Sequence, residues 1–272
     1  WVVFDKTSPE DFSTGNVLSI GGNEVTNVWN STNTSINIYI PIVDNDTTLI
    51  NGKIKILAKI GSNGWEEIGD SFPITISDAG TNKIVSLTSL QIEAITGFAD
   101  EDTITFTTIL LDRPGNETQG SASINRLVID QTIPTISLIH IESNNIDSTK
   151  AKVGDQITVS FTADEIIDNP SMIISSNNAT VNNLDTYTWE GSYIMTDSDE
   201  EGSIQFQIED YTDSRGNPAN GTSLTSDESN VIFDRTKPTL DFVGLSTDNI
   251  WNNRWAKLGE NASIDINASE DL

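Results

Sequence analysis

A short motif that occurs three times places the strongest constraint on how this chain folds. Each copy has three apolar residues followed by the pattern D-x-T-x-P, at residues 2–9, 127–134 and 231–238. A motif that returns at comparable spacing is the signature of an internally repeated architecture. The repeats therefore have to be assigned before any single strand or site is considered.

Two further patterns recur in step with the first. The segment AKVGD at 151–155 returns as AKLGE at 256–260, and D-x-x-G-N occurs at 112–116 and at 213–217. Three coincident patterns predict tandem homologous domains, and the chain is expected to be a slice of a longer array. The predicted parts are the last strand of a preceding domain at 1–4, a first domain at 5–129, a second at 130–233 and the incomplete start of a third at 234–272.

The predicted secondary structure is almost entirely β. Apolar and polar residues alternate with period two over 156–161, 186–195 and 203–208, which is typical of half-buried strands. About seven short strands in a domain of about 100 residues fit an immunoglobulin-like sandwich. In the second domain the predicted strands are 135–141, 156–163, 171–175, 179–182, 186–195, 203–211 and 229–233, and in the first domain residues 89–96 predict one or two helical turns.

The linkers predict how the domains are joined. Pro9, Pro134 and Pro238 fix their own φ and hold the preceding residue extended. Only about four residues separate the last strand of one domain from the first strand of the next, which is too short for a flexible tether. The predicted fold class is therefore all-β, with tandem immunoglobulin-like β-sandwich domains arranged as an extended rod.

Composition excludes several classes of function. The chain has 14 Lys+Arg against 41 Asp+Glu, a net charge of −27, so it lacks the basic patches that bind nucleic acid or anionic membranes. It has no cysteine for disulfides or thiol catalysis and a single histidine, His140, so no histidine pair can hold a metal. No apolar stretch approaches the length of a membrane span. We expect a protein that is not an enzyme and whose ligand is a cation.

The D-x-T-x-P linker, the acidic end of strand 156–163 and the D-x-x-G-N turn together resemble the bacterial immunoglobulin-like repeats of giant surface adhesins, including gliding-motility adhesins. Related arrays occur in archaeal surface-layer proteins. The resemblance implies a β-sandwich stalk outside the cell, at the cell surface, often with Ca²⁺ at the domain junctions. The first domain departs from the pattern, because it is longer and its second strand ends in Pro41–Asp44.

Topology predicts where the acidic residues meet. In such a sandwich the N-terminus, the loop after the second strand and the loop before the last strand share one pole, and the loop after the fifth strand lies at the other. Carboxylates of neighbouring domains then converge at each junction, where Ca²⁺ accepts six to eight oxygen ligands. The candidate ligands are Asp5, Asp44, Asp112, Asp100, Glu101, Asp102, Asp130, Glu165, Asp213, Asp197, Asp199, Glu200, Asp234 and Glu270. The alternative is that these are solvated acidic loops and that D-x-x-G-N is plain turn chemistry.

The sequence predicts a structural segment of a large extracellular surface protein, a calcium-stiffened stalk that projects an adhesive region or contributes to a surface assembly. Its partners would be the neighbouring domains of the same chain and, in an assembly, identical chains. One alternative is a segment of a surface-layer (S-layer) lattice, in which identical chains contact each other through symmetric surfaces. The other is a glycan-binding module, for which Trp251 and Trp255 are the candidate contact residues, although the favoured interpretation of both is a packed core or an inter-domain contact.

Overall fold

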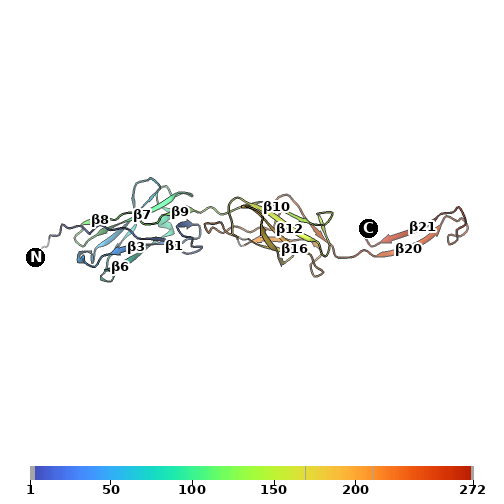
Figure 1. Cartoon of the computed structure of the whole chain (residues 1–272), viewed down its shortest axis with the longest axis horizontal. Coiled ribbons are helices and arrows are strands. Elements are labelled where there is room, and N and C mark those ends of the chain that lie inside the picture. Colours follow the sequence, from blue (N-terminus) through green and yellow to red (C-terminus); the bar gives the residue numbers. More distant parts are fainter. Residues whose placement is uncertain (1–3, 169, 210, 271–272) are drawn as a thin grey trace.

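The computed structural model describes residues 4–168, 170–209 and 211–270. Within these ranges nearly all regular structure is β, and the buried apolar residues form two clusters. One cluster extends from Val17 to Ile129 and the other from Ile139 to Phe233, and we call the two units the first and the second sandwich. In Figure 1 the first sandwich, the second sandwich and a C-terminal hairpin follow one another along the chain. The predicted strand at 1–4 falls almost wholly outside the described residues.

The first sandwich has two sheets, in the orders β1-β3-β6 and β2-β9-β7-β4-β5, with β8 paired to β7. Strand β3 shows why they pack: every second residue is buried, which turns one face of the strand to the core. The short helix α1 (Ser89–Glu93) begins at a capping box in which Gln91 accepts hydrogen bonds from Thr88. The strands are β1 (Val17–Ile20), β2 (Val28–Asn30), β3 (Ser35–Ile42), β4 (Lys53–Ile60), β5 (Glu66–Pro73), β6 (Thr81–Thr88), β7 (Thr103–Leu111), β8 (Glu117–Gln119) and β9 (Leu127–Asp130), with 3-10 turns η1 (Thr47–Leu49) and η2 (Ile76–Asp78).

The second sandwich sets the sheet β10-β12-β16-β15 against two three-stranded sheets, β14-β13-β18 and β11-β19-β17. Residues Ile157, Val159 and Phe161 of β12 are almost fully buried between them. The strands are β10 (Ile136–Ser143), β11 (Lys150–Ala151), β12 (Gln156–Ala163), β13 (Ser171–Ile174), β14 (Asn177–Asn178), β15 (Thr180–Asn183), β16 (Thr188–Ile194), β17 (Gly202–Ser203), β18 (Phe206–Glu209) and β19 (Ile232–Phe233).

The C-terminal hairpin consists of β20 (Leu240–Thr247) and β21 (Ala262–Ala268), which pair antiparallel. Its long connection repeats a hydrogen-bond pattern of the second sandwich. Asp155 accepts from the backbone N–H of Lys152 at 2.9 Å and from the side chain of Asn145 at 2.7 Å. Glu260 accepts from the N–H of Lys257 and the side chain of Asn249, both at 2.9 Å. The AKVGD and AKLGE segments thus form the same local structure.

These observations confirm the predicted all-β immunoglobulin-like sandwich fold. Strand β12 covers the predicted range, and α1 is the helical turn predicted within 89–96. The prediction of one strand over 203–211 was wrong, because the chain changes sheets there: β17 pairs with β19, whereas β18 pairs with β13. In the described residues no helix is long and apolar enough to cross a membrane.

Candidate inter-domain junction

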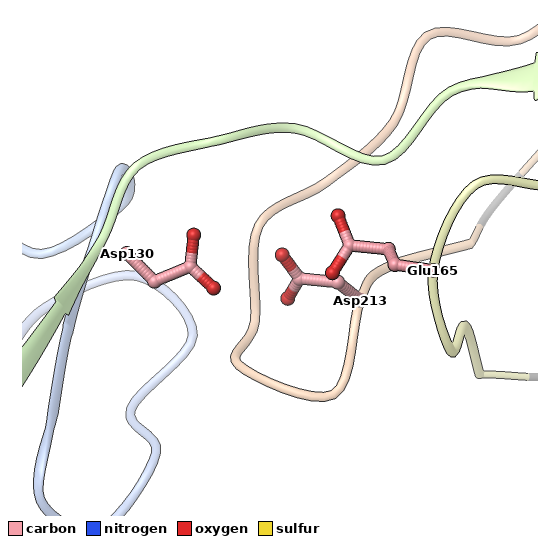
Figure 2. A group of neighbouring side chains, drawn as sticks. All are labelled: Asp130, Glu165 and Asp213. Atoms are coloured by element: carbon pink, nitrogen blue, oxygen red, sulfur yellow. The ribbon is translucent and has the colours of Figure 1, made fainter. Parts of the chain in front are cut away.

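Three carboxyl groups meet between the two sandwiches. Asp130 ends β9, Glu165 follows β12 and Asp213 lies on the turn after β18, and one carboxyl oxygen of each residue lies within 4.8 Å of the other two. Figure 2 shows the three side chains reaching the same space from three separate segments. Asp130 is 5% exposed and Asp213 only 1%, so much of this charge is withdrawn from water. We call Asp130, Glu165 and Asp213 the acidic cluster.

The electrostatics of the cluster follow from this crowding. Burial, and then the charges of Asp213, Asp130 and Asp164, raise the pKa of Glu165 to about 7. Burial likewise raises the pKa of Asp130, although the N–H of Thr132 bonds to its carboxylate. An acid whose pKa is raised binds protons more tightly in the folded state than in the unfolded chain. Ionising the acidic cluster at neutral pH therefore costs folding free energy.

One cation already contacts the cluster. The guanidinium of Arg215 forms a two-pronged pair with Glu101, with Nη1–Oε1 at 2.5 Å and Nη2–Oε2 at 3.1 Å, and Nη1 lies 3.3 Å from Asp130 Oδ2. The hydrogen bond from Arg215, with its charge, lowers the pKa of Glu101. Arg215 therefore ties the second sandwich to a loop and to the last strand of the first. Our sequence reasoning did not identify Arg215, because the variable positions of D-x-x-G-N carried no signal.

The turn at 213–217 is built by Asp213 itself. Its carboxylate accepts the backbone N–H groups of Arg215 at 2.8 Å and Asn217 at 2.9 Å, and the Asn217 side chain at 2.8 Å. In the turn at 112–116, Asp112 accepts the N–H groups of Gly115 and Asn116, both at 2.7 Å, and the Asn116 side chain at 2.8 Å. Turn chemistry thus accounts for both D-x-x-G-N motifs, and only Asp213 also joins a carboxyl cluster.

The turn at 213–217 docks on residues 23–33 of the first sandwich, a segment that contains the short strand β2 and that we call the amide loop. Asn23 donates to the carbonyl of Gly216 at 2.9 Å, and Asn30 donates to the carbonyl of Arg215 at 2.7 Å. The backbone N–H of Ser31 donates to Asn217 Oδ1 at 2.8 Å. Three neutral hydrogen bonds therefore join the sandwiches beside the acidic cluster.

Gly216 makes this close approach possible. Its φ of +92° is a conformation that side chains disfavour, and a Cβ there would lie 2.7 Å from Asn30 Nδ2 and 3.1 Å from the Cβ of Asn23. Sequence reasoning missed the amide loop, since asparagine-rich segments are common in exposed loops. Only the complete burial of Asn30 marks it as part of an interface.

Each linker is held by a second, repeated arrangement. The linker aspartate accepts the N–H of the threonine two residues later, at 3.0 Å for Asp5, 3.1 Å for Asp130 and 2.8 Å for Asp234. This is a side-chain turn that stiffens the chain locally. It explains the recurring Asp, whereas the recurring Thr also supplies a hydroxyl, described next.

A carboxylate of the preceding sandwich completes the arrangement. Asp100 accepts the N–H of Gln131 at 2.9 Å and the hydroxyl of Thr132 at 2.5 Å. Glu201 accepts the N–H of Arg235 at 3.1 Å and the hydroxyl of Thr236 at 2.7 Å. We call this pair of bonds the linker clamp. Residues predicted as metal ligands, such as Asp100, are here hydrogen-bond acceptors for the linker.

The remaining predicted ligands do not gather into a comparable group among the described residues. Asp199 is 5% exposed and accepts from Thr196 N–H at 2.6 Å, the Asn177 side chain at 3.0 Å and the Tyr193 hydroxyl at 3.2 Å. It therefore caps its own loop. Eight other predicted ligands do not belong to the acidic cluster: Asp5, Asp44, Asp102, Asp112, Asp197, Glu200, Asp234 and Glu270.

Comparison with known proteins gives no family assignment: no protein-family model and no curated protein matches the chain. Among solved structures, fibronectin(III)-like modules of Clostridium thermocellum CbhA have a TM-score of 0.33 at 12% identity, covering 81% of this chain and 94% of theirs. The chicken CNTN1 FN1-FN3 domains give 0.26 at 11% identity, covering 93% and 85%.

A third solved structure is SGBP-B of the Bacteroides ovatus mixed-linkage glucan utilization locus, in complex with a mixed-linkage heptasaccharide. It gives a TM-score of 0.20 at 14% identity and covers 86% of this chain and 50% of the other. Likenesses at these scores do not bear on function. The fold assignment rests on the sheet topology described above.

Proposed function

We propose that this chain is a non-enzymatic segment of a large extracellular surface protein, in which immunoglobulin-like domains are stacked as a stiff stalk. The stalk projects an adhesive region or contributes to a surface assembly. The observation that supports this best is the junction between the two sandwiches. There, neutral amide bonds, a two-pronged ion pair and the linker clamp act on one short connection.

We further propose that Ca²⁺ binds the acidic cluster. The resident oxygens come from Asp130, Glu165 and Asp213, and hard carboxylate oxygens on loops suit the flexible coordination of Ca²⁺ better than the strict octahedron of Mg²⁺. Arg215 compensates only part of the charge, because its guanidinium pairs with Glu101 and with Asp130 and its backbone N–H, which carries no net charge, bonds to Asp213. A divalent ion would remove the repulsion that, after burial, raises the pKa of Glu165.

An extracellular location is consistent with such a site. Calcium sites in extracellular modules are commonly weak, with dissociation constants of about 10⁻⁴–10⁻³ M. A site built from three carboxylates with a guanidinium nearby belongs in that range. Filling it would couple the stiffness of the stalk to external calcium.

The test is thermal unfolding of this chain by calorimetry in chelator and in millimolar CaCl₂, with MgCl₂ as the matched salt. A ligand that binds only the folded state must raise the melting temperature. We expect a rise with calcium and a smaller one with magnesium. An unchanged melting temperature in calcium would remove the calcium part of the proposal, while small-angle scattering that shows independently moving sandwiches would remove the stalk.

A further inference from the structure

The two D-x-x-G-N turns share the bonds from their asparagine to their aspartate but have different surroundings. The turn at 213–217 is covered by the amide loop, whereas the turn at 112–116 has no such neighbour among the described residues. A Cβ on Gly216 would collide with the amide loop, but a Cβ on Gly115 (φ +104°) would meet nothing within 4 Å. The turn at 112–116 is therefore hydrogen-bonded internally, but no described residue covers its outer face at Gly115.

The linker beside this turn shows the same contrast. In the two later linkers the D-x-T segment is held by a carboxylate of the preceding sandwich, Asp100 or Glu201. In the first linker Lys6 and Thr7 are exposed, and the Thr7 hydroxyl has no partner among the described residues. The residue after the aspartate also contacts a glutamate of the preceding sandwich in both later linkers. Gln131 donates to Glu93 at 3.0 Å, and Arg235 pairs with Glu201.

We propose that Lys6, Thr7 and the turn at 112–116 form a docking face for the pole of another immunoglobulin-like domain, one that presents an asparagine-bearing loop and an acidic loop. The proposal rests on the stacked arrangement of the proposed function and names the partner of one specific surface. The linker clamp and the amide-loop contacts define that partner, because both are formed at the next junction by this same chain.

The chemistry of the contact follows from those bonds. A carboxylate of the partner accepts the N–H of Lys6 and the hydroxyl of Thr7, and the ammonium of Lys6 adds charge complementarity. Side-chain amides of the partner donate to the carbonyls of Pro114 and Gly115, and a backbone N–H donates to Asn116 Oδ1. Pro114 stands where the second sandwich has Arg215, so no guanidinium is present at that position of the turn.

The experiment adds the partner to the full chain. A second copy of residues 5–129 is inserted directly before Asp5, so that its own amide loop and its own Asp100 face Thr7 and the turn at 112–116. Spin-label distances are measured across the new junction and across the native junction at 129–130. We expect a narrow distribution at both, with slow amide exchange at residues 6–7 that is lost in Thr7→Val.

The matched control is Thr7→Val in the chain without the insert, which should leave amide exchange and melting temperature unchanged because the hydroxyl has no partner there. A broad distribution at the new junction with a narrow one at the native junction overturns this inference alone. Broad distributions at both overturn it together with the stacked arrangement of the proposed function.

Discussion

Replacing Glu165 by Gln should stabilise the calcium-free protein at alkaline pH and not at acidic pH. Glu165 has its pKa raised from 4.5 to about 7 by burial and by neighbouring carboxylates. Because one pKa unit corresponds to about 1.4 kcal/mol, ionising this group in the folded protein costs about 3 kcal/mol at most above pH 7. Partial exposure and water screening reduce this to about 1–3 kcal/mol.

The sign follows from proton linkage. Between about pH 4.5 and 7 the folded protein binds more protons at Glu165 than the unfolded chain, so its stability falls as pH rises through this window. Glutamine removes that dependence. We expect Glu165→Gln to match the parent near pH 4.5 and to exceed it at pH 8 in chelator, where a domain of about 100 residues gains about 4–8 °C per kcal/mol.

Calorimetry at both pH values checks this, with Glu200→Gln as the matched control. Glu200 is an exposed acid outside the acidic cluster, so its replacement makes the same charge change without relieving the repulsion. Calcium should then stabilise the parent and the control but not Glu165→Gln. An equal effect of Glu165→Gln at both pH values, or an equal effect of the control, would refute the repulsion argument.

Four other substitutions test the junction and a loop cap. Gly216→Ala should broaden inter-sandwich spin-label distances, because its Cβ collides with Asn30, whereas Gly115→Ala should cost only about 1–2 kcal/mol of local backbone strain in calorimetry. Arg215→Ala should increase the flexibility seen by small-angle scattering and leave the unfolding of each sandwich nearly unchanged, and a rigid variant would contradict its bridging role. Asp199→Ala should lower the stability of the second sandwich by about 1–3 kcal/mol equally with and without calcium, since it leaves part-buried donors unpaired; a calcium-dependent loss would instead indicate a ligand.

The fold was predictable because its signals are periodic and local. Alternation along 156–163 gives β12, and the polar residues that follow it end the strand where the sequence places the loop. The break between β17 and β18 was not predictable, because Ile204 and Gln205 fit a strand equally well. Their departure from one ladder depends on which partner strand, β19 or β13, lies nearer in three dimensions.

The junction was predictable in part, for a related reason. Topology alone brings Asp130, Glu165 and Asp213 to one pole, and the structure places them together. It does not say which carboxylates turn inward to satisfy their own backbone, as Asp199 does, or which accept a neighbouring linker, as Asp100 does. Those choices depend on side-chain donors that are distant in sequence.

The amide loop fixes the geometry of the junction without using the carboxylates of the acidic cluster. Bonds from Asn23 and Asn30 to backbone carbonyls involve no net charge, so dissolved salt, which weakens exposed ion pairs, leaves them intact. The geometry of the joint can therefore be kept at high ionic strength. The proposed binding of Ca²⁺ would act on a different set of groups, the carboxylates of the acidic cluster, so the contacts that fix the geometry of the joint and the groups that sense the ion are separate.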